Sequence, residues 1–169
     1  RYGLSGFAGP RYKNYTPKKH DSLSLPGNTI ANLYEPEPGK LLFNCEGKVT
    51  LMNTTTQQFF RPPFFKEKTV YGLQSAGNQH YYAFAVDTCF LFNNKMDLVE
   101  YLLPPLRRKA EAVTAASLDH GNILTGSKWE YFIYNLSSKT YTPFPLPQGQ
   151  PPEQRFFFFH HYDTVNRHL

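Results

Sequence analysis

The chain has 169 residues, a formal net charge of +5 and a sequence pI of about 9.1. This length fits a single domain, two cysteines are too few for a disulfide framework or a metal site, and no apolar stretch reaches the roughly 18 residues of a membrane-spanning helix. The charge is mildly basic, which favours an acidic partner slightly and gives little support to nucleic-acid binding.

Aromatic residues make up 17% of the chain, with 15 Phe and 12 Tyr, while 14 Pro and 11 Gly are spread along it. Aromatic side chains suit pleated, half-buried surfaces, and dispersed Pro and Gly indicate frequent turns. The composition therefore predicts an all-β domain built from many short strands.

An asparagine recurs four times, at Asn14, Asn53, Asn93 and Asn135, with spacings of 39, 40 and 42 residues. An apolar run precedes each of the last three, and proline follows each of the four further along the chain. A repeat of about 40 residues with short strands is typical of a β-propeller, in which each repeat forms one blade.

Strand candidates fill three complete units, which span roughly residues 29–62, 69–104 and 112–146. In chain order the candidates are 29–34, 41–45, 49–52 and 57–61; then 69–73, 81–86, 89–92 and 98–102; then 112–118, 123–125, 129–134 and 140–142. Gly39, Gly77 and Gly121 follow the first strand of each unit, where a tight turn requires positive φ. Residues 106–113 contain helix-forming residues after Pro105, so a single helical turn before the third unit is an alternative there.

The two ends of the chain match the halves of one further unit. Residues 1–26 match the third and fourth strands of a unit, at 12–14 and 22–25, and residues 154–169 match its first two strands. We therefore expect an all-β fold: a β-propeller of four-stranded blades, with three complete blades and a fourth shared by the two termini. Such a shared blade removes exposed sheet edges by closing the ring.

Two alternatives to a four-bladed ring stay open. The chain begins at Arg1 rather than Met, which an upstream piece removed or cut away would explain, and half-units at both ends are also expected of a part of a larger, six- or seven-bladed propeller. A β-trefoil also has repeats near 40 residues, but four echoes and four strands per unit argue against it.

Residues 134–141 read Tyr-Asn-Leu-Ser-Ser-Lys-Thr-Tyr and are followed by a proline-rich stretch. This segment resembles the Kelch or F-box-associated signature, and residues 162–166 resemble the strand pair that those domains place next. The turn-strand-proline pattern as a whole resembles Kelch, F-box-associated and WD40-type propellers. The Gly-Gly doublet of Kelch blades and the Gly-His and Trp-Asp marks of WD40 blades are absent, so no individual family is singled out. The resemblance implies a recruitment or scaffold role, often as one module of a larger protein.

Candidate catalytic and metal-binding residues are sparse. Cys45 and Cys89 are expected to be free, partly buried thiols. His160 and His161 belong to the densest histidine cluster, but successive residues of a strand point to opposite faces, so both cannot easily bind one ion. Lone carboxylates such as Asp87 and Glu130 beside strands are most simply surface groups. We therefore expect neither an enzyme nor a bound cofactor or metal.

The connections between units and the loops between second and third strands share one face of a propeller. On that face basic residues outnumber acidic ones, and aromatic residues lie among them. The candidate partner-binding residues are Arg61, Phe64, Phe65, Lys66, Lys68, Arg107, Arg108, Lys109, Lys48 and Lys128. Aromatic side chains surrounded by Arg and Lys suit an acidic peptide, a partner domain or a neighbouring subunit.

These features favour a non-catalytic protein–protein interaction module. The alternative is a secreted propeller that binds or processes carbohydrate, which the aromatic content and three Asn-x-Ser/Thr sequons at Asn14, Asn53 and Asn135 would support. All three sequons coincide with the recurring asparagine, and a turn explains asparagine at these positions better than a glycan does.

Overall fold

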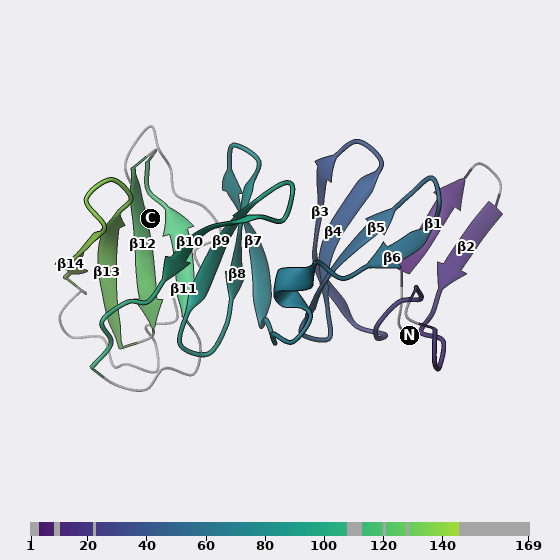
Figure 1. Ribbon diagram of the computed structural model, residues 1–169, viewed down its shortest axis with the longest axis horizontal. Helices are drawn as coiled ribbons and strands as arrows, with labels where there is room; N and C mark the ends of the chain where they lie inside the picture. Colours follow the sequence, from purple (N-terminus) through teal and green to yellow (C-terminus); the bar gives the residue numbers. More distant parts are fainter. Residues whose placement is uncertain are drawn as a thin grey trace.

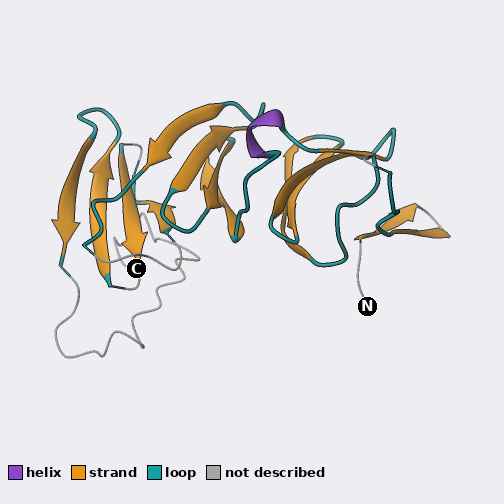
Figure 2. Ribbon diagram, turned by 60° about the horizontal axis from the view of Figure 1, so that its bottom comes forward, coloured by secondary structure: helices purple, strands orange, loops and turns teal. Residues whose placement is uncertain are grey.

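The computed structural model describes residues 4–8, 11–21, 23–107, 113–119, 121–127 and 129–145. These residues form an all-β structure of three four-stranded antiparallel sheets and a two-stranded hairpin, arranged side by side in a row (Figure 1). The hairpin consists of β1 (Leu4–Ala8) and β2 (Arg11–Tyr15). Figure 2 shows the same row from another side, with one short helix on the connection between two sheets.

Within each sheet the strands pair in sequence order, so each sheet is a simple meander. The first sheet contains β3 (Ile30–Glu37), β4 (Lys40–Cys45), β5 (Lys48–Asn53) and β6 (Gln58–Phe60), and is followed by the short 3₁₀ helix η1 (Pro63–Phe65). The second contains β7 (Gly72–Gly77), β8 (His80–Phe84), β9 (Cys89–Asn93) and β10 (Leu98–Leu102). The third contains β11 (Thr114–Ser117), β12 (Asn122–Ser127), β13 (Glu130–Asn135) and β14 (Thr140–Phe144).

The predicted three units of four strands are confirmed as three separate sheets. The strand predicted at 98–102 has the observed bounds, and most others agree to within one to three residues at each end. β7 is the exception, since the strand predicted at 69–73 spans Gly72–Gly77 and so begins three residues and ends four residues later than predicted. Val70 belongs to the connection instead: its amide donates to the Gly47 carbonyl at 2.9 Å, and its own carbonyl accepts the Asn44 side-chain amide at 3.0 Å.

The recurring asparagine closes the turn between the third and fourth strands of every sheet. The side-chain oxygen of Asn53 accepts the amides of Thr55 and Thr56, both at 2.9 Å, and Asn135 accepts the next amides in the same way. In the second sheet Asn93 accepts the amides of Lys95 and Asp97. An asparagine that caps its own backbone in this way fixes the hairpin, so the turn role predicted for these three residues is confirmed.

The prediction for the N-terminal segment is only partly correct, because residues 12–14 lie in a strand, β2, as expected, but residues 23–25 do not form one. Asn14 lies within β2, opposite Ser5, rather than in a turn between two strands. Residues 23–25, predicted as a strand, form a turn and a bend, and Leu25 is 1% exposed in a core cluster with Phe43 and Phe59. Burial of this apolar side chain and one backbone hydrogen bond, from the Phe59 amide of β6 to the Leu23 carbonyl at 3.3 Å, anchor the segment. The strands predicted at 154–169, and most of the helical turn predicted at 106–113, lie outside the described residues.

The second sheet is covered on both faces, so the first four residues of its strand β9 are all apolar. Phe90 and Phe92 pack with side chains of the first sheet, whereas Cys89 and Leu91 pack with side chains of the third. Alternate residues of a strand point to opposite faces of the sheet. Because both faces are covered here, every residue of the Cys-Phe-Leu-Phe run can be apolar. The hydrophobic core is therefore divided into clusters that lie between consecutive sheets.

Neighbouring sheets are joined by hydrogen bonds between their first strands. Asn32 of β3 adopts φ +56° and its side-chain oxygen accepts the amide of Leu73 in β7 at 3.1 Å. Ser117 of β11 donates to the carbonyl of Ala76 in β7 at 3.1 Å. The connections between sheets also repeat one hydrogen bond. The Val70 amide donates to the Gly47 carbonyl, and the Val113 amide donates to the Ala85 carbonyl at 3.0 Å. In both cases the acceptor lies in the turn between the second and third strands of the preceding sheet.

Candidate functional site

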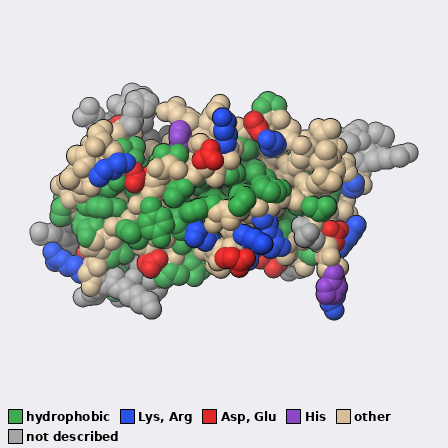
Figure 3. All heavy atoms as spheres, viewed as in Figure 1, with side chains coloured by type: hydrophobic (Ala, Val, Ile, Leu, Met, Phe, Trp, Pro, Cys, Tyr) green, Lys and Arg blue, Asp and Glu red, His purple; other side chains and the backbone are tan. Residues whose placement is uncertain are grey.

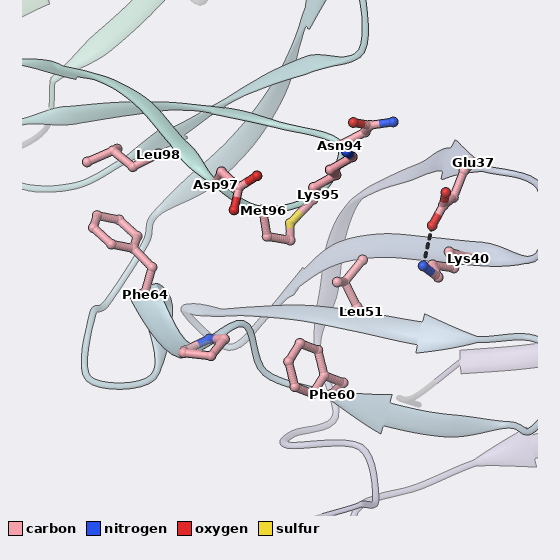
Figure 4. Close-up of a pocket in the computed structure, with 11 residues that line it drawn as sticks. Glu37, Lys40, Leu51, Phe60, Phe64, Asn94, Lys95, Met96, Asp97 and Leu98 are labelled. Atoms are coloured by element: carbon pink, nitrogen blue, oxygen red, sulfur yellow. Dashed lines mark ion pairs between the residues drawn. The ribbon is translucent and has the colours of Figure 1, made fainter.

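A groove of about 720 Å³ separates the outer parts of the first and second sheets (Figure 4). Its size lies within the range of ordinary ligand and peptide sites, about 300–1,000 Å³. The first sheet and η1 supply one side, and the turn between β9 and β10 supplies the other. The lining residues are Glu37, Lys40, Leu51, Phe60, Pro63, Phe64, Asn94, Lys95, Met96, Asp97 and Leu98.

Aromatic side chains form the base of the groove on the η1 side. The ring of Phe64 packs edge-on against Phe65 at 4.9 Å and against Phe90 at 5.2 Å between ring centroids. The ammonium group of Lys68 lies 4.8 Å from the centroid of Phe64 and 5.6 Å from that of Phe90, in cation–π geometry. Lys68 therefore contributes a positive charge that is held in place beside an apolar wall.

The charged groups around the groove are partly paired. Glu37 and Lys40, on the turn between β3 and β4, form an ion pair with each other. Asp97 accepts the side-chain amide of Asn93 at 3.2 Å and is tied to its own turn. Lys95 is exposed at the tip of the same turn, and no carboxylate within the described residues forms an ion pair with it.

Large apolar side chains are exposed along this region. Phe60 at the end of β6 is 54% exposed, and Leu98, Val99 and Tyr101 of β10 are between 41% and 47% exposed. A band of hydrophobic side chains crosses the middle of the molecule on the face seen in Figure 3, with basic and acidic groups along it. Contiguous apolar surface of this kind marks binding sites more often than solitary exposed residues do.

The predicted partner-binding residues are only partly brought together. Arg61, Lys66 and Arg107 are exposed, while Lys48, Phe64 and Lys68 are half-buried. Arg108, Lys109 and Lys128 lie outside the described residues. Phe65 requires a correction: at 1% exposure it is a core residue, and its ring packs against Phe92 at 5.1 Å, so it is not available to a partner.

The groove does not coincide with the loop face expected from the sequence, because most of its lining comes from the opposite ends of the strands. Lys95, Met96, Asp97 and Leu98 lie on the turn between the third and fourth strands, not on the loops that were expected to bind. Only Phe64 is common to the prediction and the groove lining, although Arg61 directly follows Phe60 in the chain and Lys68 contacts Phe64.

Cys45, Cys89 and Glu130, the described residues considered for catalysis or metal binding, are buried or hold the backbone in place. Cys45 and Cys89 are free and fully buried, and burial raises the pKa of both thiols, which makes them poor nucleophiles. Glu130 accepts the backbone amide of Arg107 and so fastens the connection that leads into the third sheet. Within the described ranges, no three His, Cys, Asp or Glu side chains are grouped as a metal site would require. The cluster at His160 and His161 lies outside those ranges.

None of the helices in the described part of the chain has the length and hydrophobicity to cross a membrane. The sequons at Asn53 and Asn135 lie in turns whose geometry uses the asparagine side chain, and the amide nitrogen of Asn135 also donates to Asn122 at 3.0 Å.

Comparison with known proteins gives structural likeness only. No family model matches the sequence, and no curated protein matches it. The crystal structure of the extracellular domain of a hybrid two-component system from B. thetaiotaomicron aligns with a TM-score of 0.63 at 18% identity, over 85% of this chain and 22% of that one. The chain thus spans about a fifth of the length of that structure, and the likeness shows a shared all-β fold. The computationally designed Ika8 protein aligns with a TM-score of 0.45 at 15% identity, over 72% of this chain and 38% of its own.

Proposed function

We propose that this chain is a non-catalytic protein-interaction module and that its three sheets are consecutive blades of a β-propeller. The architecture is supported by the contacts between the first strands of successive sheets and by the repeated bonds of Val70 and Val113 to the preceding sheet. In a propeller the first strands of all blades lie around the axis, and each blade packs its faces on its neighbours.

In the proposed propeller, the β1–β2 hairpin begins the blade that lies next to the first sheet. The β1–β2 hairpin packs through Leu4 and Tyr15 against the face of the first sheet, with the Tyr15 and Phe59 rings 5.6 Å apart. A hairpin there occupies the place of half a blade. Residues 154–169 would complete it in a four-bladed ring, and further sheets would do so in a larger propeller.

One observation carries the proposed function: an open groove with exposed apolar walls lies between two sheets that are otherwise closely packed. Exposed apolar surface costs solubility, and proteins use it mainly to bind other molecules. The basic residues Arg61, Lys66 and Arg107 on the connections between sheets add a complementary field for an acidic partner.

Partner capture with charge-reversed variants tests this function. The whole chain is immobilised, and proteins captured from its native source are identified by mass spectrometry for the wild type and for the double variant Arg107→Glu with Arg108→Glu. We expect specific partners to be lost from the variant while its far-ultraviolet circular dichroism is unchanged. A matched control is Lys19→Glu, an exposed lysine on the N-terminal segment. Identical capture by all three proteins would refute the role of these loops.

A further inference from the structure

At the groove, one position of the repeat carries leucine instead of an aromatic residue, and a register shift follows it in β10. In each sheet the residue just before the turn asparagine pairs with a residue of the fourth strand: Met52 with Phe59, Phe92 with Leu98, and Tyr134 with Tyr141. Phe59, Leu98 and Tyr141 therefore occupy the same place in the three sheets.

The two aromatic residues close the space that leucine leaves open. Phe59 is 5% exposed and packs against Tyr15 of the hairpin. The ring of Tyr141 lies 4.6 Å from that of Tyr134, and its hydroxyl oxygen accepts the Leu103 amide of the preceding sheet at 2.9 Å. Leu98 is shorter and 41% exposed, and it faces Phe64 across the groove (Figure 4). The groove thus lies where the second sheet lacks the aromatic side chain that the first and third sheets have at the same position.

The charges near this position are mainly positive. Glu37 is neutralised by Lys40, and Asp97 is bonded within its turn. Lys95 lines the groove, is exposed and forms no ion pair with a carboxylate among the described residues, and Lys68 adds its charge beside Phe64. The groove and its aromatic wall therefore carry three lysines, Lys40, Lys68 and Lys95, against two carboxylates, Glu37 and Asp97.

From this geometry we infer that the groove binds an extended acidic segment of a partner protein, which inserts one bulky aliphatic or aromatic side chain beside Leu98. The inserted side chain takes the place that Phe59 and Tyr141 fill in the other sheets. Carboxylates on either side of it interact with Lys95 and with Lys68. The inference rests on the proposed protein-binding function and specifies the partner at one site. The apolar anchor supplies most of the affinity and the carboxylates supply selectivity.

Labelled peptides test the inference directly by fluorescence anisotropy. The probes are an acidic hexapeptide with Leu-Phe at its centre, the same peptide with Ser-Gly at its centre, and a basic hexapeptide with Leu-Phe at its centre. We expect only the first to bind, with a Kd on the order of micromolar, as is usual for small interfaces. Its affinity should fall with increasing salt.

Two pairs of variants locate the binding. Leu98→Tyr fills the groove with the residue that the third sheet uses, so we expect affinity to fall about tenfold or more, which is the effect of losing a buried anchor. Leu33→Tyr changes a leucine of β3 that is 50% exposed and does not line the groove, and should leave binding unchanged. Lys95→Glu should weaken binding several-fold, whereas Lys19→Glu should not.

Several results would overturn the inference: no binding of the acidic anchored peptide, equal binding of the basic peptide, or unchanged affinity in a folded Leu98→Tyr variant. Each of these outcomes leaves the proposed function standing if Arg107→Glu with Arg108→Glu still loses its captured partners. If that capture is also unaffected, the groove inference and the assignment of binding to the loop at Arg107 and Arg108 both fail. A wild-type chain that captures no specific partner would refute the protein-binding function itself.

Discussion

The hydroxyl oxygen of Tyr141 accepts the backbone amide of Leu103 at 2.9 Å and so joins the outer strand of the third sheet to the end of the second. The Lys139–Glu100 ion pair joins the same two strands nearby. The joint between the first and second sheets has Leu98 where Tyr141 stands in the next joint. Leu98 and the register shift that follows it in β10 therefore distinguish the joint that holds the groove from the joint at Tyr141.

Tyr141→Phe should lower the free energy of unfolding by about 1 kcal/mol, because it removes the acceptor of the Leu103 amide but keeps the ring. The loss is limited because Leu103 is 52% exposed and its amide can bond to water. Urea denaturation measures the change. Tyr71→Phe, at a tyrosine that is 58% exposed, is the matched control and should have almost no effect. Equal stability of the two variants would show that the Tyr141 hydroxyl contributes nothing.

Alkaline pH should destabilise the protein through its buried tyrosines. Burial raises the pKa of Tyr141 to about 12, only partly offset by the Leu103 amide, and burial also raises the pKa of Tyr82 and Tyr131. An unfolded tyrosine ionises near its ordinary value of 10.0. Above that pH the unfolded chain binds fewer protons than the folded one, so stability is full below it and falls as pH rises toward about 12.

Phenolate absorbance and urea denaturation across this range check the alkaline prediction. We expect a fraction of the tyrosines to ionise only when the chain unfolds. Tyrosines that all titrate near the ordinary value in the native protein, with constant stability through the range, would contradict the burial argument.

The strands of the three sheets could be predicted because their signals are local. Asn53, Asn93 and Asn135 each end an apolar run and close a turn with their own side chains, so short segments of sequence carry the information. Asn14 has the same residue type but pairs with Ser5 in a hairpin, and only its tertiary surroundings reveal the difference. Val70 likewise looks like part of a strand, yet its hydrogen bonds to Gly47 and Asn44 hold it in a connection.

The groove could not be predicted in the same way, because it depends on a missing side chain rather than a motif. Leu98 is an ordinary strand residue until its register is known to match that of Phe59 and Tyr141. Phe65 was wrongly predicted to bind a partner, because an aromatic residue among basic residues is typical of a binding surface. The short helix η1 turns that ring into the core and leaves Phe64 at the groove.

Substitutions of Asn32 should separate its hydrogen bond from its backbone conformation. The side chain accepts the Leu73 amide, and the residue has φ +56°, which asparagine and glycine tolerate better than alanine. Asn32→Asp keeps the acceptor and should be mildest. Asn32→Gly loses only the acceptor, about 1 kcal/mol, and Asn32→Ala should lose about 1–2 kcal/mol more from strain. Chemical denaturation gives the order, and an alanine variant as stable as the glycine variant would exclude strain at this position.

Gly126→Ala should be the most damaging small substitution in the third sheet. A Cβ atom at Gly126 would lie 2.2 Å from the carbonyl oxygen of Glu130 and 2.8 Å from the Cα atom of Tyr131, so the β12 and β13 backbones would have to separate. Backbone atoms cannot yield as a flexible side chain would, and we expect a loss of about 3 kcal/mol or more.

Gly77→Ala is its matched control. Gly77 has φ +78° and no heavy atom within 4 Å of the added Cβ, so only conformational strain of about 1–2 kcal/mol should result. Thermal and urea denaturation of both variants, read by circular dichroism, measure the difference. If the two alanine variants lose the same stability, the close approach of β12 and β13 does not require glycine, and the packing of the third sheet must be looser than its register implies.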